Sequence, residues 1–104
     1  MKKLLLSFVA LVVMAGQVLA GDFTITCNTS GYAVVVEVVD KQNPQATKEV
    51  TLSPKESKTV NITGTEVQVK VFDKGMHELR CTGEFRSNAN VKVTNVSSLW
   101  EVKE

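Results

Sequence analysis

Apolar and polar residues alternate in short runs along most of the chain after residue 20, and this alternation constrains the fold strongly. Phe23, Ile25 and Cys27 alternate with threonines, and the pattern recurs at residues 67–72. A period of two places every second side chain on one face of a strand, whereas a helix needs a period near 3.6. Turn-forming clusters separate the runs at 28–31, 41–46, 53–57, 73–75 and 87–90. The sequence therefore predicts an all-β fold.

The spacing of these turns predicts seven or eight short strands in one domain, residues 21–104. Short strands with turn signals every eight to twelve residues are typical of a small antiparallel β-sandwich. Glycine in the turn Asp73-Lys74-Gly75 is available for a positive φ, which favours a tight hairpin there. No segment after residue 20 shows a helical period with caps.

The first 20 residues have the three-part layout of a secretory signal peptide. A basic start at Lys2-Lys3 precedes an apolar run over residues 4–14, and Val18-Leu19-Ala20 supplies a small-residue cleavage site. An apolar core of about 11 residues is short for a membrane span, which takes about 20. We expect cleavage after Ala20 and export to the periplasm or the outside of a bacterial cell. No membrane span is expected after cleavage.

Cleavage leaves 84 of the 104 residues, with 10 basic and 11 acidic side chains and a formal charge of −1. Nucleic acids and anionic membrane surfaces are bound by clustered Lys and Arg. Here the charges are scattered singly along the expected strands. We therefore expect no nucleic-acid partner.

Cys27 and Cys81 are the only two cysteines in the sequence. In an oxidising compartment, a small domain often relies on a disulfide for stability. Closing a loop of about 55 residues would stabilise the fold by about 4 kcal/mol in the chain-entropy model. Redox-active thiols usually lie close together in the sequence, as in Cys-x-x-Cys. We therefore expect one structural disulfide between Cys27 and Cys81.

Residues 49–60, Glu-Val-Thr-Leu-Ser-Pro-Lys-Glu-Ser-Lys-Thr-Val, resemble a strand–turn–strand found in many immunoglobulin-like bacterial modules. The resemblance covers about an eighth of the chain and implies an immunoglobulin-like sandwich. The general layout is also similar to that of the small periplasmic curli-assembly proteins, which restrain amyloid subunits. That second likeness is one of size, export and strand order, and it assigns no residue.

The sequence contains no motif for catalysis or for a cofactor. No serine lies in a Gly-x-Ser-x-Gly elbow, and no spacing pairs two carboxylates for acid–base work. We expect that the protein is not an enzyme, has no catalytic residues and needs no cofactor. His77 is the only histidine, and beside Met76 it forms the one pair with copper-binding chemistry. We assign no metal site, and a copper-binding or small-molecule-binding protein using this pair is the alternative function.

Two features are candidates for contact with another protein. The valine-rich segment containing Val34, Val36 and Val38 is either a buried central strand or an edge that pairs with a partner's backbone. Trp100, near the C-terminus, is either part of the core or an exposed anchor for a partner. The expected function is protein–protein binding with another exported protein, as a chaperone, an inhibitor or an accessory or adhesion module.

Overall fold

The computed structural model describes residues 21–104, which form eight strands and no helix. The predicted signal peptide, residues 1–20, lies outside the described residues. The expected all-β fold of seven or eight strands is confirmed for residues 21–104. The strands are β1 (Gly21–Asn28), β2 (Val34–Asp40), β3 (Thr47–Leu52), β4 (Ser57–Ile62), β5 (Glu66–Asp73), β6 (Leu79–Arg86), β7 (Asn90–Val96) and β8 (Leu99–Lys103).

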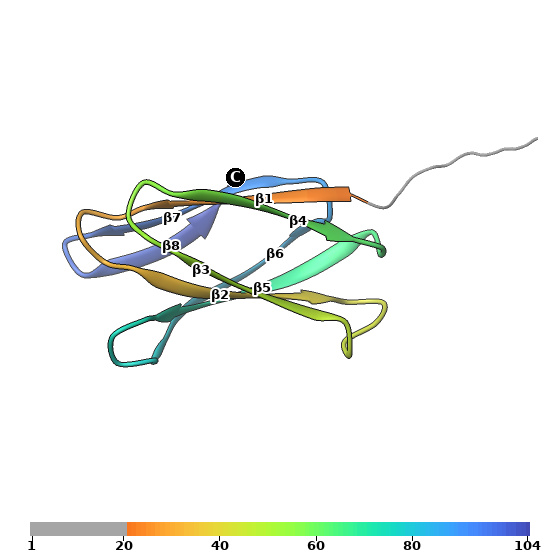
Figure 1. The fold of residues 1–104 in the computed structure, drawn as a ribbon, viewed down its shortest axis with the longest axis horizontal. Coiled ribbons are helices and arrows are strands. Elements are labelled where there is room, and N and C mark those ends of the chain that lie inside the picture. Colours follow the sequence, from red (N-terminus) through yellow and green to blue (C-terminus); the bar gives the residue numbers. More distant parts are fainter. Residues whose placement is uncertain (1–20) are drawn as a thin grey trace, which may run out of the picture.

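The eight strands form two four-stranded sheets that pack face to face (Figure 1). One sheet has the order β4-β1-β7-β8 and the other β3-β2-β5-β6. Across the sandwich, edge strand β3 contacts β4 and edge strand β6 contacts β8. Both sides of the sandwich are therefore bordered by two edge strands, one from each sheet.

Hydrogen-bonded neighbours are antiparallel with one exception, because β1 pairs with β7 in parallel. Strand β7 enters its sheet after the chain crosses from β6 in the other sheet, and it then runs in the same direction as β1. The expectation of a wholly antiparallel sandwich is wrong at this pair. Alternation along a single strand carries no signal for the direction of its neighbour.

The core lies between the two sheets and is made from alternate residues of the strands. Eight valines contribute to it, since β-branched side chains suit a pleated, half-buried surface. Phe23 and Ile25 of β1 are fully buried, as the period-two pattern predicts. The other apolar residues buried in this cluster are Cys27, Val34, Val36, Val38, Leu52, Ile62, Val67, Val69, Val71, Ala89, Val91 and Val93.

The expected disulfide is absent, and Cys27 and Cys81 are both free thiols. Cys27 lies on β1, the second strand from the β3/β4 side, while Cys81 lies on edge strand β6 at the opposite side. Neighbouring strands are about 4.8 Å apart and packed sheets about 10 Å, so the two Cα atoms are separated by far more than the ~7 Å that a disulfide allows. The Cys27 thiol instead donates to the Tyr32 carbonyl, with an Sγ–O distance of 3.5 Å. The prediction failed because it had no information on strand order.

Candidate functional site

Five large apolar side chains are exposed in the described part of the chain, and all five lie near the same end of the sandwich. They lie in the β1–β2 and β5–β6 loops, at the start of β6 and on either side of the β7–β8 turn. These connections gather at the left of Figure 1, and the chain enters β1 at the opposite end. We define this region as the apolar end. Its five residues are Tyr32, Met76, Leu79, Val96 and Leu99, with exposed fractions of 51 to 68%.

A hollow of about 560 Å³ opens at the apolar end between the β1–β2 and β5–β6 loops. Tyr32 and Met76 lie on its lining, together with Ala33 and the carboxylate-bearing Asp73. The two loops are joined by a hydrogen bond of 3.1 Å from the backbone N–H of Lys74 to the carbonyl of Ala33. The apolar side chains that line the hollow therefore come from two loops that are hydrogen-bonded to each other.

Asp73 shapes the β5–β6 loop through its carboxylate. Its Oδ1 accepts hydrogen bonds from the backbone N–H of Gly75 at 2.7 Å and of Met76 at 3.2 Å. The positive φ in this loop falls at His77, at 57°, and not at Gly75. The predicted hairpin is present between β5 and β6, but its positive φ is not at the glycine, because the Asp73 side chain organises a wider loop that ends at Leu79.

Arg80 lies between the two sheets at the apolar end and is held by two carboxylates. Its Nη2 is 2.9 Å from Asp73 Oδ2 and 3.2 Å from Glu78 Oε1. The hydrogen bond from Arg80, reinforced by those from Met76 and Gly75, lowers the pKa of Asp73 below its usual value. Arg80 Nε is buried and has no hydrogen-bond partner among the described residues. The cation is thus fixed in position by its charge pairs.

Trp100 is half-buried and packs against the edge of the core. Tyr32 approaches it in an edge-on arrangement, with the ring centroids 5.7 Å apart. The Arg80 guanidinium lies 5.8 Å from the centroid of the Trp100 ring, within cation–π range. Trp100 is therefore partly buried against the core, and its ring contacts the exposed Tyr32.

Val34, Val36 and Val38 are fully buried on β2. Strand β2 is hydrogen-bonded to β3 on one side and to β5 on the other. Strand β2 therefore has no free edge for a partner, and it is the buried central strand, the first of the two alternatives.

The exposure of four other residues is not predicted from the sequence, and they are Tyr32, Leu79, Val96 and Leu99. Nothing in the local pattern distinguishes an exposed apolar residue at a strand end from a buried one.

Met76 and His77 do not form part of a larger group of metal-binding residues. The imidazole of His77 stacks on the Phe72 ring, with the centroids 5.3 Å apart. Within residues 21–104, no three His, Cys, Asp or Glu side chains are grouped so that they could hold a metal ion. The structure adds no feature that favours copper at this pair.

No protein-family model matches this sequence, and no curated protein is significantly similar to it. In the described range, no helix is long and apolar enough to cross a membrane.

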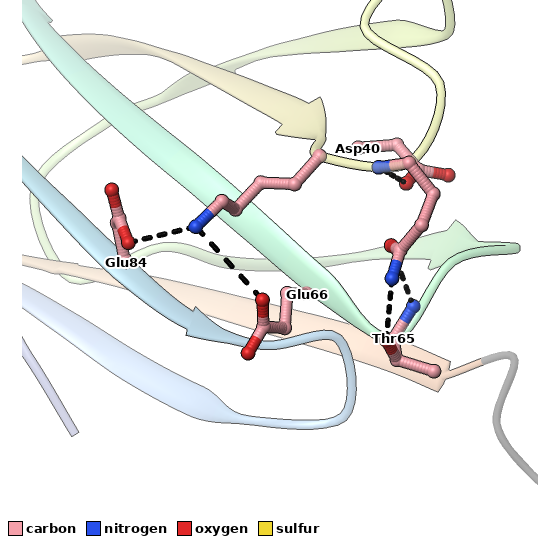
Figure 2. Close-up of polar contacts among 6 residues, drawn as sticks. Asp40, Thr65, Glu66 and Glu84 are labelled. Carbon is pink, nitrogen blue, oxygen red and sulfur yellow. Dashed lines mark hydrogen bonds and ion pairs between the residues drawn. The ribbon is translucent and has the colours of Figure 1, made fainter.

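The opposite end of the sandwich is polar. Lys41 Nζ lies 2.9 Å from Glu84 Oε1 and 3.9 Å from Glu66 Oε1 (Figure 2). The side chain of Gln42 bridges to Thr65, donating to its hydroxyl at 2.7 Å and accepting from its backbone N–H at 3.1 Å. The two ends of the molecule therefore differ in chemistry, with paired polar groups at one and exposed apolar groups at the other.

Asp40 connects two loops at this polar end. Its carboxylate accepts hydrogen bonds from the backbone N–H of Gln42 and of Gly64 and from the Thr63 hydroxyl. A side chain at Gly64 would overlap the Asp40 carboxylate, so this close approach requires glycine. The polar groups at this end are thus used within the fold.

Proposed function

We propose that this chain is an exported, periplasmic or secreted β-sandwich protein that binds another exported protein through its apolar end. The observation that carries the proposal is the gathering of Tyr32, Met76, Leu79, Val96 and Leu99 at one end of the molecule. Exposed apolar side chains that cluster in this way mark interaction sites on soluble domains. On this proposal the protein acts by binding and not by catalysis.

Tyr32 and Met76 are the proposed anchors of the interface. Both line the hollow, and Tyr32 is positioned by the Trp100 ring. Tyr and Met are enriched in the cores of protein interfaces, where a rigid aromatic ring or an adaptable thioether fills a partner's pocket. A partner that inserts an apolar side chain between them would bury both residues.

We also infer an immunoglobulin-like sandwich. The resemblance of residues 49–60 to a strand–turn–strand of such modules supports this topology, since they include four of the six residues of β3 and four of the six residues of β4. The parallel pairing of the first strand with a late strand in the same sheet is a second supporting feature.

The binding test starts with tagged protein, residues 21–104, which is crosslinked to its partner in a periplasmic extract or in the culture medium of the cells that produce it. Once the partner is identified, its affinity is measured by calorimetry for wild type, Tyr32→Ser and Met76→Ser. We expect each substitution to weaken binding at least about tenfold, or ~1.4 kcal/mol, as for a residue at the centre of an interface.

Two variants serve as controls in the same titrations. Lys92→Ser removes an exposed long side chain from β7, away from the hollow, and should leave the affinity within about twofold of wild type. His77→Ala tests the copper-binding alternative. This substitution should leave the affinity for the partner unchanged if the apolar end binds protein, whereas it should lower the affinity for copper if the imidazole is a ligand. Wild-type affinity in both Tyr32→Ser and Met76→Ser would reject the apolar end as the binding surface.

A further inference from the structure

The two open sides of the sandwich differ in the side chains that point between the sheets. On the β3/β4 side, Lys48 of β3 lies opposite buried Val38, and Lys58 of β4 lies opposite buried Ile25. Directly opposite residues share a face of the sheet, so both lysines project from the core face of an edge strand. An added strand would have to bury these charges, and inward-pointing charges are a known protection against edge pairing.

On the β6/β8 side, no lysine or carboxylate lies on the core face within β6 or β8, and Glu104 follows directly after β8. The core face of β6 carries Cys81, Gly83 and Phe85, opposite buried valines of β5. On β8, Trp100 and Val102 point inward, and Arg80 at the β6 bulge is already paired with Asp73. Four of these apolar side chains are only half-buried, and they are Cys81, Phe85, Trp100 and Val102.

Strand β8 is the edge of its sheet, and its outer face has an alternating charge pattern. Glu101 and Lys103 lie on this face 3.6 Å apart. Lys103 is also directly opposite Lys92 of β7, and like charges in that position are unfavourable. Strand β8 therefore has a free backbone edge and an apolar inner face. Its Lys103 has no anion opposite it on β7.

These charges are complementary to those of a second β8 in one particular register. In an antiparallel pair centred on Val102, Glu101 of each copy lies opposite Lys103 of the other, and the inner faces stay matched. Moving the centre by one residue to Glu101 or to Lys103 keeps the faces matched but places identical charges opposite each other. The charge pattern thus selects the register centred on Val102.

We propose that two copies of this chain associate edge to edge through antiparallel β8 strands centred on Val102. The result is a continuous eight-stranded sheet, β4-β1-β7-β8-β8-β7-β1-β4. Because β6 faces β8 across the sandwich, the second copy also covers the half-exposed Phe85, Trp100 and Val102. A five-residue strand forms a small interface, so the dimer forms in a concentration-dependent way.

This association is independent of the proposed binding through the apolar end. In the dimer, the two Leu99 residues are six strand positions apart, or about 20 Å. The two apolar ends therefore lie at opposite ends of the paired strands, and each remains open.

The test is a charge exchange followed by sedimentation velocity over a range of concentrations. Wild type should show a monomer–dimer equilibrium, and Glu101→Lys and Lys103→Glu should each weaken it at least about tenfold, because like charges then face each other. The double variant E101K/K103E should recover the dimer. A mixture of the two single variants should form a heterodimer, since each supplies the charge that the other lacks.

Lys58→Glu is the matched control, because it makes the same charge change on the opposite edge of the same sheet. It should dimerise like wild type, and circular dichroism should show the same β signal for every variant. Wild type that stays monomeric at all concentrations would overturn the proposal. This holds even if β8 were found to pair with a strand of another protein. A dimer that the single charge changes leave unaltered would overturn it too.

Discussion

Asp73 illustrates how much of the site depends on single side chains that the sequence pattern does not mark. The residue ends β5 and is buried, and it accepts two backbone hydrogen bonds while pairing with Arg80. In the sequence alone, Asp73 is a single polar residue in a turn that contains a glycine. A carboxylate two residues before a glycine is a known signal for a side-chain-stabilised turn. That signal could have indicated the loop, although not the contact with Arg80.

Replacing Asp73 with Asn should change how stability depends on pH. The pKa of Asp73 is lowered in the folded protein, so its charge stabilises the fold above its unfolded pKa, near 3.8, and this contribution is lost as the pH falls below that value. We expect Asp73→Asn to be less stable than wild type at pH 6, with the difference narrowing below about pH 4. Urea unfolding at a series of pH values measures this difference. A stability difference between Asp73→Asn and wild type that stays constant with pH would contradict the argument.

Cys81 should react slowly with thiol reagents despite its position on an edge strand. Burial, and then the nearby charge of Glu101, raise the pKa of its thiol from 9.0 to about 11. At pH 8 the thiolate fraction is therefore about 100-fold lower than for a thiol of ordinary pKa, and the thiolate is the reactive form. The rate of reaction with a disulfide reagent in Cys27→Ala protein, followed from pH 7 to 11, measures this pKa. A rate that levels off near pH 9 would show that the thiol is not shielded.

At the scale of the strands, the period-two pattern predicts which residues face the core but not which strands become neighbours. The expected strands at 23–27 and 67–72 appear as β1 and β5 with the correct residues inside. Lys48 and Lys58 show where the period-two pattern is not sufficient, since both are charged residues at core-face positions on edge strands. Only the strand order explains why a lysine is tolerated there, because an edge leaves room for the ammonium group to reach water.

Replacing both inward lysines should open the β3/β4 side to association. In Lys48→Val/Lys58→Val, the core faces of β3 and β4 become apolar, and a strand can be added without burying a charge. We expect a melting temperature no lower than that of wild type but a new, concentration-dependent increase in particle size. Dynamic light scattering detects this change. Lys92→Val, which makes the same replacement on an inner strand, should leave the particle size as in wild type.

At the scale of the whole molecule, the sequence predicts the class of the fold well and the site poorly. Alternation and turn spacing are local, and they are sufficient to predict an all-β sandwich of seven or eight strands, of which the structure has eight. The number of cysteines and the expected compartment predict a Cys27–Cys81 disulfide, but the strand order keeps the two cysteines apart. The apolar end is assembled from three connections, of which the first and the last are more than 60 residues apart in the chain. Its residues become neighbours only because the sandwich brings alternate connections to one end.

The inward-pointing Lys58 has a consequence for how far any assembly of this chain can grow. Within residues 21–104, the β6/β8 side is the one without an inward-pointing lysine on its edge strands, and a copy that joins through β8 uses this side. The outermost strand of the extended sheet is then β4. That strand carries Lys58 on its core face, so it terminates the sheet at each end. Polymerisation by strand addition would therefore stop after two copies, and the chain is built to form a closed pair and not a fibre.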